Sequence, residues 1–313
     1  MDRKNEMYQG KMAGKQVRTK SHYRSVSHPN ACGVFNRRNL ADGLLLALIY
    51  LSSLLSVILI AGILIYILAK GVPMFSRAFF TTVSSAWHGT TGIAGNIVNT
   101  LYIIVLTLVI AVPVGIGAAV WLHEYAGQGR GVRLIEFAIQ TLAGIPSIIF
   151  GMFGMMFFGT TLGLGYSILT GALTLTLMVL PLITRNTMEA LRAVPEGYRA
   201  GAYGMGAARW YMIRTILLPA ARPGILTGVI LAVGRIVGES AALLFTAGSG
   251  YLLPESGAGL LRKASESGGT LAVQMYLSMS RAEYDTAFGI GAVLLCVVVL
   301  LNGMIHILAR RRY

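Results

Sequence analysis

Charge is scarce in this sequence, and negative charge is the scarcest. Asp and Glu number 12 against 26 Lys and Arg, and charged residues make up 12% of the 313 residues. A soluble domain usually carries about 25% charged residues. Here 55% of the residues are hydrophobic and the mean hydropathy is +0.67. The composition therefore argues against a large aqueous core and indicates a chain that folds in a lipid bilayer.

Cysteines and catalytic motifs are also scarce. The two cysteines, Cys32 and Cys296, cannot form a disulfide framework or a metal site, and His123 and His306 have no partners at metal-ligand spacing. The sequence contains no G-x-x-x-x-G-K-[ST] phosphate loop, no G-x-S-x-G or H-E-x-x-H motif and no paired acidic catalytic site. We therefore expect a chain that is not an enzyme and needs no cofactor or metal. If it drives active transport, a separate ATPase must supply the energy.

Long apolar runs are what the sequence does have. Six of them can span a hydrocarbon layer of about 30 Å at about 1.5 Å per residue: residues 40–69, 95–122, 134–158, 162–184, 223–247 and 286–309. These runs predict an all-α polytopic membrane protein with six transmembrane helices. The third and fourth runs are joined by a tight Gly-rich stretch and should form a helical hairpin. Pro113, Pro146 and Pro181 imply kinks within the bundle.

The basic residues lie mostly on one side of these spans. If the N-terminus is inside, the inner segments carry 20 Lys and Arg and the outer segments carry 5, so both termini should be cytoplasmic. The tail, residues 1–39, is basic, and we expect it to be disordered and solvated, resting on anionic lipid. Nucleic-acid binding by the tail is an alternative, but the tail has no reading motif. The permease domain expected after it covers residues 40–313.

A cytoplasmic insert, residues 185–222, interrupts the apolar runs. It is too polar to cross the bilayer, yet helix formers in it are broken by Gly201, Gly204 and Gly206. This pattern predicts two short helices with a bend that glycine permits. The residues that recur at helical spacing are Tyr198, Ala202 and Met205, then Trp210, Ile213 and Leu217. The insert could dock a cytoplasmic protein, or it could be an interfacial element that only packs against the bundle.

The spacing of Gly206, nine residues, and then Ile-Leu-Leu-Pro at 216–219 resembles the "EAA" loop of ABC-importer permeases. The positions that match this loop are Ala200, Gly201, Ala202, Gly206, Ile216, Leu218 and Pro219. The resemblance implies that the insert is the coupling helix that docks in a groove of an ATPase subunit. Ala200 replaces the usual glutamate, and Glu196 is a candidate substitute for it.

Longer strings resemble the PstA family of phosphate-importer permeases over residues 36–309. They are TLAGIPSIIFGMFG (141–154), LPLITRNTMEALRAVP (180–195), LPAARPGILTGVILAVGRIVGESAALLFTAG (218–248) and TLAVQMYL (270–277). The resemblance implies the type I permease fold of ABC importers in the cell membrane. It also implies three kinds of partner: a homologous PstC-like permease, a PstB-like ATPase dimer that uses the ATP, and an external PstS-like phosphate-binding protein. Transport would then proceed by alternating access.

Two charged residues lie within the fifth apolar run. Arg235 falls near mid-bilayer, where a charge costs about 2.5–3.5 kcal/mol, so it should face protein or a wet cavity. Glu239 follows four residues later, a spacing that puts both side chains on one helix face, where they can pair. One interpretation is a structural pair that neutralises itself. The other is a substrate pathway in which the planar guanidinium lowers the barrier for an anion such as phosphate, and the PstA resemblance implies this pathway.

Other functions stay open from the sequence. A permease for another oxyanion would carry the same features. A membrane-embedded enzyme is disfavoured by the missing catalytic motifs. A non-transporting scaffold or sensor subunit is disfavoured by Arg235 within a span.

Overall fold

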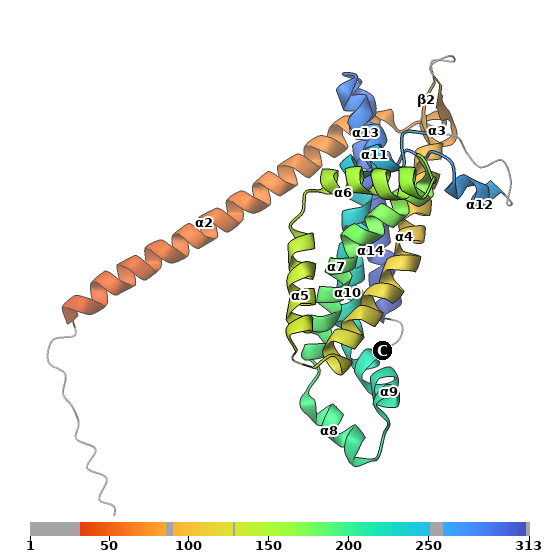
Figure 1. The fold of residues 1–313 in the computed structure, drawn as a ribbon. Coiled ribbons are helices and arrows are strands. Elements are labelled where there is room, and N and C mark those ends of the chain that lie inside the picture. Colours follow the sequence, from red (N-terminus) through yellow and green to blue (C-terminus); the bar gives the residue numbers. More distant parts are fainter. Residues whose placement is uncertain (1–31, 86–89, 128, 251–258, 311–313) are drawn as a thin grey trace, which may run out of the picture. The chain divides into compact units, whose positions relative to one another are not determined.

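The structure is a computed structural model of the chain, and it describes residues 32–85, 90–127, 129–250 and 259–310 (Figure 1). The chain separates into two compact units, residues 1–61 and 62–313. Of the basic tail expected at residues 1–39, residues 1–31 lie outside the described part. Residues 32–39 are helical and begin α2 (Cys32–Gly71).

Helix α2 supplies the described part of unit 1 and the first residues of unit 2. It carries no charged residue between Asp42 and Lys70, and it is long and apolar enough to cross a membrane over Asp42–Met74. Its last residue, Gly71, packs so closely on Phe288 and Ala292 that an added Cβ would clash with both. Glycine is therefore required where α2 meets the C-terminal helix of unit 2.

The rest of unit 2 is almost entirely helical. Its elements are η1 (Val72–Met74), α3 (Arg77–Thr81), β1 (Val83–Ser85), β2 (Thr90–Ile93), α4 (Ala94–Val120), η2 (Trp121–Tyr125), α5 (Arg130–Ala143), α6 (Ser147–Gly154), η3 (Met155–Thr161), α7 (Ile168–Arg192), α8 (Glu196–Gly204), α9 (Arg209–Met212), η4 (Ile213–Leu217), α10 (Leu218–Gly238), α11 (Ala241–Thr246), α12 (Gly259–Ala264), α13 (Leu271–Ser280) and α14 (Tyr284–Arg310). Helix α7 packs between α4 and α10 (Figure 1). Buried aliphatic side chains such as Ile103, Leu175, Val179 and Ile236 fill their contacts.

Five described helices are long and apolar enough to cross a membrane, and a bent pair of helices raises the number to six. The bent pair replaces the single third span expected at 134–158. Helices α5 and α6 meet at 102°, because Pro146 is extended (φ −58°, ψ 139°) and a residue before proline is disfavoured in a helix. Pro113 and Pro181, in contrast, lie inside the unbroken helices α4 and α7.

The connection before α7 is longer than the sequence suggested. Helix α7 begins at Ile168 rather than near 162, because Gly163 and Gly165 have positive φ (71° and 59°). The hydroxyl of Ser167 caps it by accepting a hydrogen bond from the Thr170 amide. The N-terminus of α7 is thus set by a glycine turn and a serine cap. The apolar residues before that turn form η3.

The end of unit 2 opposite the insert contains elements that the sequence treated as loops. Strands β1 and β2 pair antiparallel, with Val83 opposite Ile93. Asn96 and Asn99 on α4 are buried, and both side-chain amides donate to the carbonyl of Gly269, at 2.9 and 3.3 Å. These bonds tie the segment before α13 to α4. Residues 271–280 form α13, and its first residues, Leu271, Ala272 and Val273, are buried in protein.

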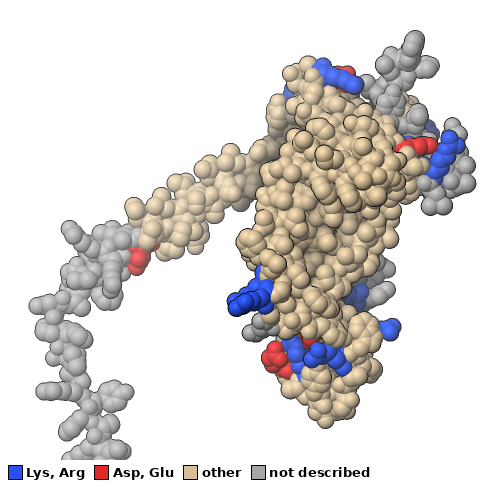
Figure 2. All heavy atoms as spheres, in the orientation of Figure 1, with Lys and Arg blue, Asp and Glu red and all other residues tan. Residues whose placement is uncertain are grey.

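Charged side chains on unit 2 gather at its ends. On the face that Figure 2 shows, Lys, Arg, Asp and Glu lie around the insert and at the opposite end, and uncharged residues cover the zone between them. This distribution suits helices whose middle lies in hydrocarbon and whose ends reach water or headgroups.

Candidate functional site

The insert forms the two short helices that its glycines predicted. Helices α8 and α9 are joined at Gly206, whose φ of +77° lies in the left-handed region that favours glycine. The amide of Gly206 donates to the Tyr203 carbonyl at 2.9 Å, and the amide of Ala207 donates to the Ala202 carbonyl at 3.0 Å. These bonds close the end of α8 and turn the chain back toward the bundle.

One side of the insert is anchored in protein. The buried side chains of α8, α9 and η4 are Ala202, Met212, Ile213 and Leu217, and they pack in one cluster with Val120 of α4, Leu191 of α7 and Val194 just after α7. The contact attaches the insert to the ends of two long helices. Helix α8 is thus connected to α4 and α7 through Ala202 and this cluster.

The insert also exposes large side chains: Tyr198, Tyr203, Met205, Trp210 and Tyr211, which are 47–81% exposed. We call these five residues the aromatic face of the insert. The helical stripe expected from Tyr198, Ala202 and Met205 is wrong as a single face, because Ala202 points inward and the other two point outward. Concentrated exposed apolar surface on a short element is typical of a protein contact.

The residues that match the EAA pattern divide between these two sides. Ala200 and Gly201 are exposed beside the aromatic face, whereas Ala202 is buried under α8. Ile216 and Leu218 are half-buried, and Pro219 is exposed in the first turn of α10, where proline is tolerated. Glu196, the candidate substitute for the missing acid, is 87% exposed, and its Oε1 lies 3.2 Å from Arg199 Nη1.

An ion-pair network that the sequence interpretation missed joins the insert to η2, which follows α4 directly. Arg199 Nη2 lies 3.0 Å from Glu124 Oε1, and the two side chains are only 12% and 7% exposed. The same guanidinium donates to the carbonyls of Leu191 and Val194, at 3.2 and 3.4 Å. His123 Nδ1 lies 3.0 Å from the same Glu124 oxygen. We call Glu124 and Arg199 the strut.

The sequence does contain a feature that indicates a buried ion pair at Glu124. Glu124 is one of only 12 acidic residues, and it stands at the end of an apolar run where a carboxylate must find a partner. A second contact lies beside it, where the Arg209 guanidinium sits 5.4 Å from the centre of the Tyr125 ring. The end of α4 therefore holds both helices of the insert.

The two charges of the fifth span are not arranged as their spacing predicted. Helix α10 ends at Gly238, and Glu239 is extended (ψ 117°), so Arg235 and Glu239 do not share a continuous helix. No ion pair joins them. Glu239 is buried, and its Oε1 accepts a hydrogen bond from the Ala242 amide at 3.0 Å, which caps α11. The expectation of a helical Arg–Glu pair is wrong because the helix breaks between them.

Arg235 is left on an open face of α10. It is exposed, and it forms no hydrogen bond or ion pair with any other residue that the structure describes. Thr227 and Leu231 are exposed on the same face, and a Cβ added at Gly234 or Gly238 would meet no atom within 4 Å. An unpaired guanidinium therefore stands on an uncovered side of a helix that is apolar enough to cross a membrane.

Comparison with known proteins assigns a family. Residues 111–312 match the model of the binding-protein-dependent transport system inner membrane component. This chain belongs to that family. Its relatives are multi-pass membrane permeases of ABC importers, in which ATPase activity lies in partner subunits. The permease is 40% identical over 211 residues to the Bacillus subtilis protein named "Probable ABC transporter permease protein YqgI", covering 67% of this chain and 72% of that protein.

Other relatives carry a substrate in their names. The permease is 34% identical to the phosphate transport system permease protein PstA of Xylella fastidiosa, covering 68% of this chain and 75% of the relative. It is also 34% identical to PstA of Haemophilus influenzae, covering 70% and 77%. Among solved structures, a bacterial alginate ABC transporter in complex with an alginate pentasaccharide-bound periplasmic protein aligns with a TM-score of 0.64 at 17% identity, covering 88% of this chain and 96% of the other. That likeness supports the ABC-importer permease fold.

Proposed function

We propose that this ABC-importer permease carries inorganic phosphate into the cell, through a pathway that passes along the open face of α10. Two observations support the substrate. Several relatives at 33–37% identity are named as phosphate permeases, and Arg235 offers an unpaired guanidinium within a span. The second observation carries the proposal, because relatives with no named substrate share the fold equally well.

The argument from Arg235 is energetic. Arg235 lies in the last turn of α10, which ends at Gly238, and a charged side chain within a membrane span is retained where it faces protein or water. No described residue of this chain pairs with Arg235. A homologous, PstC-like permease packed near α10 would place the guanidinium in a wet pathway between the two subunits. There the planar fork could donate two parallel hydrogen bonds to a phosphate.

The insert would supply the driving motion. A PstB-like ATPase dimer on the cytoplasmic side would dock on the aromatic face, and closure of that dimer on ATP would move α8. The strut and the buried cluster would pass the motion to α4 and α7. The spans would then open outward, accept phosphate from a PstS-like binding protein, and return after hydrolysis. Both termini would be cytoplasmic in this arrangement.

Uptake of radiolabelled phosphate tests the proposal. The full chain and its partner subunits are expressed in cells without another phosphate importer, and Arg235→Gln is compared with Arg281→Gln, an exposed arginine between α13 and α14. We expect Arg235→Gln to abolish uptake while the complex still assembles, and Arg281→Gln to keep it. Normal uptake by Arg235→Gln would refute the pathway. Equal inhibition by excess sulfate and excess phosphate would replace phosphate with a broader oxyanion class.

A further inference from the structure

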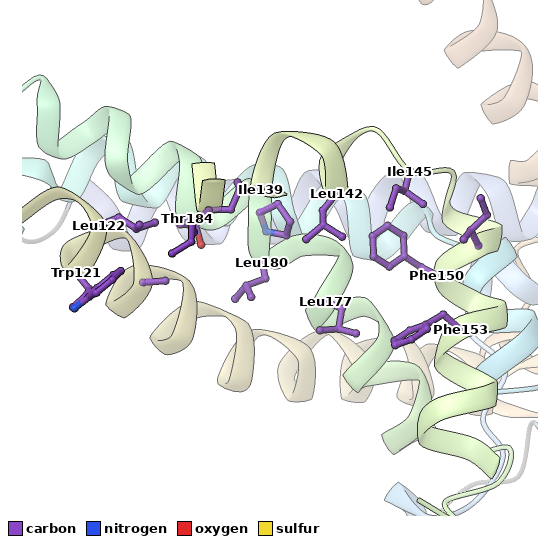
Figure 3. Close-up of a pocket in the computed structure, with 14 residues that line it drawn as sticks. Trp121, Leu122, Ile139, Leu142, Ile145, Phe150, Phe153, Leu177, Leu180 and Thr184 are labelled. Carbon is purple, nitrogen blue, oxygen red and sulfur yellow. The ribbon is translucent and has the colours of Figure 1, made fainter. Parts of the chain in front are cut away.

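A large apolar cavity lies between α4, η2, α5, α6 and α7. Its volume is about 680 Å³. Figure 3 shows Leu122, Ile139, Leu142, Phe150, Leu177 and Leu180 projecting toward it from these elements. Thr184 contributes a hydroxyl at one end.

The cavity is open along one side, where Leu142, Ile149 and Phe153 are 40–51% exposed, so its apolar walls favour an apolar occupant over water. Water does not fill a space with so few polar partners. Helix α5 has no fully buried residue. Ile139 packs against Leu122 and Met188, whereas Ile135 and Leu142 face the cavity and are 39% and 40% exposed. The apolar side chains that line the cavity therefore favour a hydrocarbon occupant.

A cationic cavity adjoins the apolar one. Leu122 lines both, and the second cavity, of about 630 Å³, is also lined by His123, Arg133, Glu136 and Arg192. Arg192 Nη2 lies 2.9 Å from Glu136 Oε1, which neutralises one arginine. The Arg133 guanidinium forms no hydrogen bond or ion pair with any residue in the described part of the chain. The two guanidiniums, of Arg133 and Arg192, outnumber the single carboxylate of Glu136.

We propose that an anionic glycerophospholipid binds across these two cavities. An acyl chain fills the apolar cavity, and the phosphodiester, which carries one negative charge, lies against Arg133 with Arg192 beside it. Arginine suits this group because its fork donates two parallel hydrogen bonds to phosphate oxygens. Basic pockets between membrane helices are known to hold anionic lipid headgroups. A free phosphate ion would leave the apolar cavity empty, and an apolar partner helix would leave Arg133 without a counter-charge.

Native mass spectrometry of the full chain, with the subunits that copurify with it, tests the proposal. The complex is held in micelles supplied with equal phosphatidylglycerol and phosphatidylethanolamine. We expect the unsubstituted protein to retain phosphatidylglycerol preferentially. Arg133→Gln should lower that retention about tenfold, since a hydrogen bond to a charged group is lost. Arg130→Gln is the matched control, because Arg130 lies on the same helix but lines neither cavity.

A second pair of variants locates the acyl chain. Leu142→Trp narrows the apolar cavity and should lower lipid retention. Phe137 lies on the opposite face of α5 and is 64% exposed, so Phe137→Trp should leave lipid retention unchanged. The proposal is overturned if no lipid is retained, or if the two lipids are retained equally. It is equally overturned if Arg133→Gln behaves as Arg130→Gln does, or Leu142→Trp as Phe137→Trp does. Phosphate uptake enters none of these measurements, so the outcome is independent of the transport proposal.

Discussion

Replacing Arg199 with methionine would leave the Glu124 carboxylate, which is only 7% exposed, without its guanidinium. Removing one partner of a buried ion pair is strongly destabilising, by about 3–5 kcal/mol, because the remaining charge is uncompensated. Arg199 is 12% exposed and also satisfies the carbonyls of Leu191 and Val194. We therefore expect a cost of about 3 kcal/mol, concentrated where the insert meets the bundle.

Amide hydrogen exchange measures this cost locally. Each 1.4 kcal/mol is a factor of ten in an equilibrium constant, so protection of the α8 amides should fall about a hundredfold in Arg199→Met. Glu124→Gln should lower protection as well, by leaving the guanidinium unpaired. The double variant should recover part of the loss, because neither charge then remains buried.

The matched control is an exposed pair on α7. Arg185 and Glu189 lie 3.0 Å apart, with side chains 61% and 57% exposed, and such surface pairs contribute about 0.3–0.5 kcal/mol. Arg185→Met should therefore leave α8 protection nearly unchanged. If Arg199→Met and Glu124→Gln changed amide exchange in α8 no more than Arg185→Met does, that result would show that the strut does not stabilise the insert. It would also refute the idea that the strut couples α8 to the bundle.

Two further predictions concern single residues that set the local backbone conformation. Gly206→Ala should destabilise the insert by about 1–2 kcal/mol, because a Cβ is strained at φ +77°. A thermal unfolding scan of the purified complex should show a lower midpoint temperature. An unchanged midpoint would contradict the claim that the turn at residue 206 requires glycine. Glu239→Ala should lower phosphate uptake more than Glu239→Gln, because a glutamine oxygen can still accept the hydrogen bond from the Ala242 amide in the first turn of α11. An equal loss of uptake in both variants would mean that the negative charge of Glu239, and not its hydrogen bond to α11, is required.

Much of the fold follows from the sequence because it depends on local pattern. Long uncharged runs predict spans wherever they occur, since backbone groups in hydrocarbon must bond within one helix. The two short helices of the insert and the bend at Gly206 follow from glycine placement in the same way. The family was also recognisable from strings such as residues 218–248, and the comparison bears it out.

Only the tertiary structure decided which distant groups meet. Arg199 and Glu124 are 75 residues apart, and no local periodicity pairs them, because the contact exists only after α7 has packed against α4. The same packing separates Arg235 from Glu239, since the carboxylate caps α11 where a regular helix would have aligned it with the guanidinium. Sequence fixes which segments become helices through local hydrogen bonding, whereas the partners of buried charges depend on the shape of the assembled bundle.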